Sequence, residues 1–291
     1  MSVSGSTDPT GTVGLREREF RPALTNRFRA LRAATRTTVG YEKDALRLKR
    51  GARDGPFSVQ AAADDIDPAE RFVFQDDAEL TDAFLGWLDE QIDRGVLEPV
   101  SREQLRQGGH WSAPYIRSAA EKGWADAAAR LERQGLDVSS EDLSATFDRG
   151  VSAEQLRGLY TRTYDNIETI TDRMRTEVRR ELTQGLAEGL NPRVMADRLT
   201  DRVDVAYTDA ETLARTEIIH SYNDHALTRY ETAGVSAVTA DVEFLTAGDR
   251  RVCPLCASLS GTRYTIAEAR GIIPGGTHPQ CRCTWVPIVN T

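Results

Sequence analysis

The sequence contains little lysine, no long apolar run and few cysteines. Of its 37 basic residues only three are lysine, against 45 acidic residues, and the net charge is −8. No run of 18 or more apolar residues occurs, which excludes a membrane-spanning helix. Residues 1–14 lack the basic and then apolar order of a signal peptide, so we expect an intracellular protein. A chain of 291 residues with 40% hydrophobic content is not wholly disordered.

The acidic, lysine-poor composition is typical of a protein from a high-salt cytoplasm, because excess carboxylates keep a protein surface hydrated. A GC-rich genome is the other explanation for arginine in place of lysine. The charge is also segregated, since residues 16–53 carry a local charge of +8 and residues 64–104 carry −10. The basic segment is either a solvated helix face or an arm for a polyanion or an acidic partner. Its candidate contact residues are Arg27, Arg29, Arg32, Arg36, Arg47 and Arg50.

Apolar residues at steps of three and four predict helices through residue 234. One stripe runs from Phe20 to Leu31, and a second from Leu80 to Ile92 with Gly95 as its C-cap. A helix over 112–131 has an alanine-rich face that would let a neighbouring helix approach closely.

The next three predicted helices form a hairpin with a short intervening helix. The first spans about 152–190. Asn191 and Pro192 then supply an N-cap and a first-turn proline for a short helix that ends at Leu199. The last helix runs from about 208 to 234.

After residue 234 the pattern becomes β-like. Short strands are expected at 238–246, 262–265 and 281–289, in a tail of 57 residues that is too small for a large core. The expected fold is therefore mainly α with a small C-terminal α+β zinc-binding subdomain. The expected segments are 1–56 (disordered tail and arginine-rich helical arm), 57–150 (helical), 151–234 (helical hairpin) and 235–291 (α+β tail).

The tail carries the strongest chemical signal of the sequence. Residues 253–256 read CPLC, and residues 278–283 read HPQCRC. A CxxC turn offers two thiolates to zinc, and the second run offers two thiols and an imidazole. The five candidates for four positions are Cys253, Cys256, His278, Cys281 and Cys283. Disulfides or plain reduced thiols are the alternatives. A single zinc would stabilise so small a tail and have a structural role.

A second polar set lies on the predicted helix at 214–225. Glu217, His220 and Asp224 share one face, with His225 nearby. The spacing is not HExxH, and no second Glu-x-x-His run completes a dinuclear site. We expect a polar network that joins this helix to the tail. Its expected members are Arg215, Glu217, His220 and Asp249.

Motifs of other enzyme classes are missing. The run at 274–276 matches neither a dinucleotide-binding nor a P-loop pattern, and no nucleophile elbow supports a catalytic serine. The residues give little support to an enzyme.

Several short motifs follow one another in the second half of the chain, namely LARTE at 213–217, YN at 222–223, DRRVCPLC at 249–256, LSG at 259–261 and HPQCRC at 278–283. Together they resemble the phage Mu F-like head morphogenesis family of minor capsid proteins. The resemblance covers about residues 150–291. Phe244 stands where the family often has tryptophan, and the loop at 273–277 is slightly longer than usual.

The resemblance implies a virion component of a tailed virus and not an enzyme. The acidic, lysine-poor composition favours a halophilic archaeon as its host. The resemblance also implies a place inside the head at the portal vertex, assembly in the host cytoplasm, and a role in head assembly and in genome packaging or ejection. The expected partners are the portal protein, which the segment 57–150 would dock, with major capsid or scaffold protein and packaged double-stranded DNA as further candidates. No membrane partner is expected.

Two other functions remain open at this point. A zinc-dependent nuclease or hydrolase acting on viral DNA would use the polar set near His220. A DNA-binding structural protein would use the arginine-rich arm, and its binding would weaken steeply with added salt.

Overall fold

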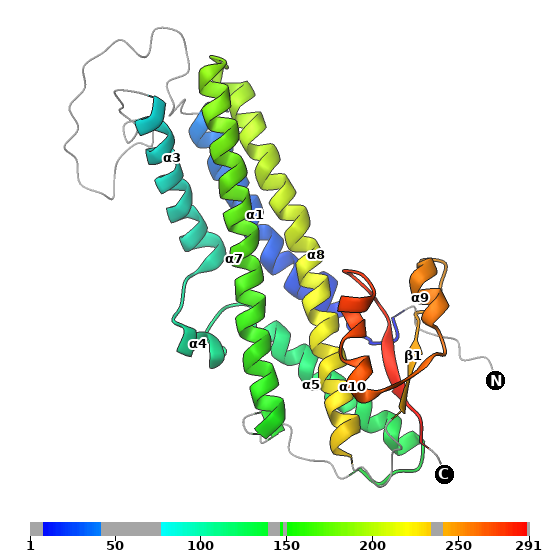
Figure 1. Cartoon of the computed structure of the whole chain (residues 1–291). Helices are drawn as coiled ribbons and strands as arrows, with labels where there is room; N and C mark the ends of the chain where they lie inside the picture. The colour runs from blue at the N-terminus through cyan, green and yellow to red at the C-terminus, as the bar shows by residue number, and fades with distance from the viewer. Residues whose placement is uncertain (1–7, 42–76, 139–145, 148–149, 234–240, 290–291) are drawn as a thin grey trace. The chain divides into compact units, whose positions relative to one another are not determined.

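The computed structural model describes residues 8–41, 77–138, 146–147, 150–233 and 241–289 (Figure 1). The chain divides into two compact units, each assembled from separate stretches of sequence. Unit 1 comprises residues 1–22, 100–165 and 212–291, and unit 2 comprises 23–99 and 166–211. Each unit combines parts of several segments expected from the sequence. The division of the chain into four segments therefore stays a prediction.

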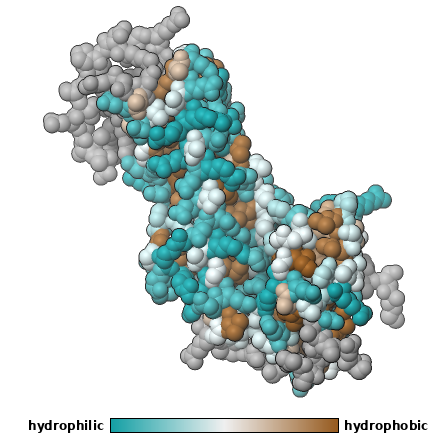
Figure 2. Space-filling model, viewed as in Figure 1, coloured by the Kyte–Doolittle hydropathy of each residue, from teal (hydrophilic) through white to brown (hydrophobic). Residues whose placement is uncertain are grey.

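Unit 2 is helical. It contains most of α1 (Arg21–Arg36), the π-helix η2 (Thr37–Tyr41), α3 (Asp77–Ile92) and the π-helix η3 (Asp93–Leu97). The second half of α7 (Gly150–Ala187) and the first half of α8 (Pro192–Thr232) complete it. The predicted stripes of α1 and α3 are buried, including Phe28 and Phe84. Figure 2 shows mainly hydrophilic residues on the visible face of the long helices, as expected where one stripe packs inward.

The predicted C-cap of α3 at Gly95 is wrong. The helix continues as η3 through Leu97, and the left-handed residue that ends it is Glu98 (φ 45°), whose N–H bonds to the Asp93 carbonyl at 2.9 Å. Burial of Val96 and Leu97 keeps the extra turn helical, because their side chains add to the apolar stripe.

The hairpin turn between α7 and α8 is confirmed, but the short helix after it is not. Asn191 Oδ1 accepts from the backbone N–H groups of Arg193 and Val194, both at 3.1 Å. From Pro192 the chain then forms one helix of 41 residues. No glycine or proline lies between 200 and 208, and Val203 and Ala206 continue the buried stripe, so nothing interrupts α8 there.

Unit 1 packs α4 (Arg102–Arg106), α5 (Ala113–Arg133), the start of α7 and the end of α8 with residues 8–22 and the C-terminal tail. The π-helix η1 (Gly14–Phe20) belongs to its N-terminal stretch. The alanine-rich face of α5 does allow a close approach to α8. Ser221 Oγ donates to the Ile116 carbonyl at 2.8 Å, and a Cβ on Gly123 would lie 2.1 Å from the Tyr222 carbonyl oxygen.

Replacing Gly123 with alanine should therefore destabilise the protein by about 1–3 kcal/mol, because two helix backbones would have to separate. Gly158→Ala on α7 is the matched control. A Cβ there meets nothing within 4 Å, so that variant should gain about 0.5–1 kcal/mol of helix propensity. Urea unfolding of both variants measures the difference, and equal effects would show that the close approach does not matter.

The tail forms a three-stranded antiparallel sheet in the order β2-β1-β3, with β1 (Asp241–Leu245) central between β2 (Arg263–Thr265) and β3 (Thr284–Pro287). Short helices α9 (Pro254–Leu259) and α10 (Ile266–Ala269) and the π-helix η4 (Ile272–Gly276) connect the strands. Phe244 and Trp285 pair on β1 and β3, with ring centroids 5.3 Å apart, and pack in one core with residues of α5 and α8. The fold class expected from the sequence, mainly α with a small C-terminal sheet and a Cys/His cluster, is confirmed.

Within the described residues, the search for a helix both long and apolar enough for a bilayer finds none.

Candidate metal centre

Two segments of the tail bring the five predicted ligands together. Cys253 is the N-cap of α9, with Pro254 in the first turn, and its Sγ accepts from the backbone N–H of Cys256 at 3.3 Å. The second segment passes from η4 through His278 to Cys281 and Cys283, directly before β3. The CxxC turn at the start of α9 therefore positions Cys253 and Cys256, and the segment that leads into β3 positions the other three side chains.

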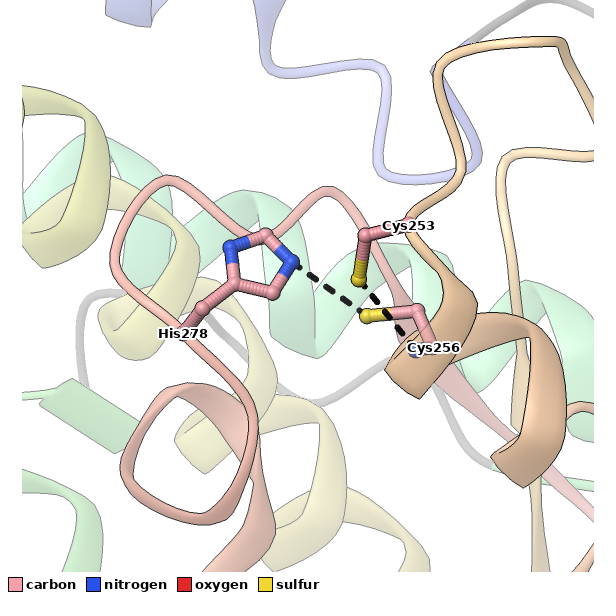
Figure 3. Close-up of side chains that lie close together, drawn as sticks. All are labelled: Cys253, Cys256 and His278. Carbon is pink, nitrogen blue, oxygen red and sulfur yellow. Dashed lines mark hydrogen bonds between the residues drawn. The ribbon is translucent and has the colours of Figure 1, made fainter.

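The donor atoms form two overlapping groups, and Cys256 belongs to both. Cys253, Cys256 and His278 form one group (Figure 3), and Cys256 forms the other with Cys281 and Cys283. Within each group the donor atoms all lie within 4.8 Å of one another. Cys256 is therefore the donor that links the two groups.

The separations fit a tetrahedral zinc site. Zn–S bonds of about 2.3 Å place two thiolates about 3.8 Å apart, and a Zn–N bond of about 2.0 Å places sulfur and nitrogen about 3.5 Å apart. The Sγ atoms of Cys256 and Cys281 are 3.7 Å apart, and Cys256 Sγ lies 3.4 Å from His278 Nε2. All four cysteines are free, and 3.7 Å is far beyond the roughly 2.05 Å of a disulfide bond. The donor set therefore fits a metal ion better than a disulfide.

The tautomer of His278 suits a metal ligand. Its Nδ1 lies 2.7 Å from the Pro279 carbonyl oxygen, which can only accept, so Nδ1 carries the proton. The lone pair of Nε2 then faces the cysteines, as in histidine ligands oriented by a backbone carbonyl. A cavity of about 230 Å³ borders the cluster and provides a path for an ion.

The thiols differ in acidity. Burial, and then the charge of the Cys281 thiolate, raise the pKa of Cys256 to about 12. A hydrogen bond from Cys283 lowers the pKa of Cys281 to about 5, and the backbone N–H of Cys256 lowers the pKa of Cys253. Buried thiolates close together repel one another, so a bound cation would be needed to ionise the whole set.

The loop that carries His278 is fastened to α8 by residues that the sequence analysis missed. Gln280 has a positive φ of 64°, its N–H donates to Thr216 Oγ1 at 3.1 Å, and its Nε2 donates to Thr212 Oγ1 at 2.8 Å. Asn223 Nδ2 donates to the Cys283 carbonyl at 3.2 Å. The LARTE and YN motifs of α8 thus hold the ligand segment in place. Their order along the chain before HPQCRC was the only sequence signal for this role.

Residues of the predicted polar network have different partners. Arg215 donates to Gln280 Oε1 at 3.0 Å and to both oxygens of Glu17, so it does contact the tail. Asp249 accepts two hydrogen bonds of 2.7 Å from Arg282, the residue between Cys281 and Cys283 in the sequence. These bonds hold the pKa of Asp249 well below its usual range.

Glu217 and His220 instead face α7. Arg162 donates to the buried Glu217 carboxylate and lies 3.2 Å from His220 Nε2. Because arginine only donates, Nε2 must accept and the imidazole is neutral. Burial, and then the charge of Arg162, lower the pKa of His220.

This lowered pKa predicts a loss of stability in mild acid. Below about pH 6.5 the unfolded chain binds a proton at His220 that the folded chain resists, so stability present above that pH is lost as pH falls. His220→Gln should reduce the decline in the urea midpoint between pH 7.5 and 5.5. An equal decline in both proteins would contradict this assignment.

The geometry does not favour hydrolysis at this second set. Asp224 pairs with Arg270 at 2.9 Å, and His225 is fully buried with its Nδ1 3.0 Å from the Ser221 carbonyl. Of the groups able to hold a metal among the described residues, none includes Glu217, His220, Asp224 or His225.

The arginines of the predicted arm that the structure describes are paired within unit 2. Arg27 donates to the Gly95 carbonyl at 3.0 Å and to Glu98. Arg29 donates to Tyr207 Oη at 2.8 Å, Arg32 lies 2.9 Å from Asp204, and Arg36 lies 4.0 Å from Asp197. Arg47 and Arg50 lie outside the described residues.

Comparison with known proteins points to the same family as the motifs. Residues 176–286 match the family model described as Phage Mu protein F like protein. No curated protein and no solved structure matches the chain. The match spans the end of α7, all of α8 and the tail through β3, which includes every candidate metal ligand. Residues 176–286 therefore form a Phage Mu protein F-like domain, in agreement with the motifs in that part of the sequence.

Proposed function

We propose that this chain is a structural minor capsid protein of a tailed virus, located inside the head at the portal vertex. It would assist head assembly and the packaging or ejection of the genome. The observation that carries the proposal is the Mu F-like domain, in which the family motifs hold the ligand loop against α8. The acidic, lysine-poor composition supports a halophilic archaeon as host.

Mass spectrometry of purified particles tests this function. We expect the chain in mature particles and in assembly intermediates, and we expect cryo-electron microscopy to locate it at the portal vertex. Its absence from both kinds of particle would contradict the proposal. A zinc-dependent DNA hydrolase would instead lose its activity in His220→Ala while keeping its metal.

We further propose that the metal is one structural zinc. Cys253, Cys256 and His278 supply three ligands, and one of Cys281 and Cys283 supplies the fourth. The thiolate and imidazole set, with separations that match a tetrahedron, supports zinc, which prefers such ligands in a closed structural site.

Single serine variants at Cys281 and Cys283 test this ligand set. One variant should keep one zinc per chain, and the other should lose it. Retention of zinc by both variants, or its loss from both, would contradict the proposed set. His278→Ala should lose the zinc.

A further inference from the structure

A second cavity in unit 1 is lined by arginine. It has a volume of about 460 Å³, within the range of about 300–1,000 Å³ of small-molecule sites. We call it the arginine pocket. Its lining residues are Val13, Arg16, Glu17, Arg215, Arg251, Gln280 and Arg282. They come from η1, α8 and two segments of the tail.

The pocket carries more positive than negative charge. Glu17 is the single carboxylate among four guanidinium groups in the lining. Arg215 binds Glu17 with two hydrogen bonds of 2.9 and 3.1 Å, and Asp249, which is not a lining residue, accepts from Arg282 and Arg251. Glu17 and Asp249 therefore already accept hydrogen bonds from other arginines. The carboxylate that remains for Arg16 is that of Asp8.

Arg16 is poorly satisfied for a buried cation. Its side chain is only 4% exposed, and its nearest carboxylate, that of Asp8, is 3.8 Å away, beyond hydrogen-bond distance. Among the described residues no acceptor reaches its Nε. Burial lowers the pKa of Arg16, and the charges of Arg282 and Arg215 lower it further, against the opposing effect of Asp8 and Glu17. A buried guanidinium with an unmet donor is costly unless an anion completes it.

We propose that the arginine pocket binds a compact phosphate, either inorganic phosphate or the terminal group of a phosphate monoester. Planar guanidinium groups match the oxygens of phosphate, often through paired hydrogen bonds. A monoester carries about 1.5–2 negative charges at neutral pH, more than the single charge of a phosphodiester in DNA. Because Arg16 is almost fully covered, a small anion can reach it more readily than a phosphate flanked by the sugars of a duplex.

Isothermal titration calorimetry of the full chain, with inorganic phosphate and adenosine monophosphate as ligands, tests the proposal. We expect one saturable site per chain for at least one of these ligands. Tighter binding of inorganic phosphate would identify the free ion as the natural ligand, and tighter binding of adenosine monophosphate would identify a phosphate monoester. Arg251→Gln should weaken binding about tenfold, because it removes a charged donor. Its side chain is 73% exposed, so the variant should fold. Arg16→Gln and Arg215→Gln should weaken binding at least as much.

Arg250→Gln is the matched control. Arg250 is exposed and does not line the pocket, and its replacement removes the same charge as Arg251→Gln. The phosphate affinity of Arg250→Gln should therefore stay within about twofold of that of the parent. The proposal would be overturned by no saturable binding of either phosphate, or by an equal loss in Arg250→Gln. Tighter binding of glutarate or of a short DNA duplex than of phosphate would also overturn it.

Discussion

Replacing Cys256 with serine should abolish binding of the proposed structural zinc and unfold the tail. Cys256 is the donor that both groups share, and its Sγ lies 3.4 Å from His278 Nε2 and 3.7 Å from Cys281 Sγ, so its loss reduces each group from three donors to two. Structural zinc contributes on the order of 10 kcal/mol to folding of small domains, which is comparable to the whole stability of a typical protein. We expect the free energy of unfolding of the tail to fall by about 5 kcal/mol or more. Serine is close in size to cysteine, so a cavity does not explain a loss of this size.

Hydrogen exchange of residues 241–289, with zinc analysis of the same sample, measures this effect. Ser258→Ala on α9 is the control, because Ser258 is exposed and its hydroxyl donates to the Leu255 carbonyl of the same short helix. That variant should keep its zinc and its protection. Slow exchange of the tail in Cys256→Ser, equal to that of the parent, would show that the cluster does not stabilise it.

The second large effect is expected at Arg130 on α5. Its guanidinium donates to the carbonyls of Trp285 at 2.8 Å and Pro9 at 3.0 Å, and to the hydroxyls of Tyr222 and Tyr230, both at 3.2 Å. One side chain thus joins β3, the N-terminal stretch and α8. Arg130→Met keeps much of the apolar stem but removes all four of these hydrogen bonds, and the Trp285 carbonyl then keeps only the Tyr230 hydroxyl, at 3.2 Å, among its side-chain donors in the described residues. We therefore expect a loss of about 3 kcal/mol.

Arg133→Met is the matched variant for this test. Arg133 lies three residues further along α5, is exposed, and donates to the Ala129 carbonyl of its own helix at 3.0 Å. Its replacement should change the stability by less than about 0.5 kcal/mol. Urea unfolding compares the two, and a similar small change at both positions would contradict the role given to Arg130.

Local patterns predicted most of the fold. The stripes from Phe20 and Leu80, the Asn191 cap and the strands of the tail depend on neighbouring residues, and sequence spacing records such dependence. Helix ends were predicted less well. The extension of α3 beyond Gly95 and the continuity of α8 depend on burial of side chains within unit 2, which no local motif reports.

The candidate site divides in the same way. The five candidate ligands could be identified from the sequence because CxxC and HPQCRC are short motifs with a definite chemistry. The partners that position them were not, since Gln280 meets α8 more than 60 residues away in sequence. Arg130 bonds carbonyls that are 121 and 155 residues away, and a backbone carbonyl carries no sequence signal.

We propose above all that one zinc ion, bound by the Cys/His cluster, stabilises the Mu F-like domain. Elemental analysis of the purified full chain, combined with X-ray absorption at the zinc edge, tests it most directly. The account predicts one zinc per chain, coordinated by three sulfur atoms at about 2.3 Å and one nitrogen atom at about 2.0 Å. A chain without zinc whose four cysteines react with thiol reagents only after reduction would contradict it.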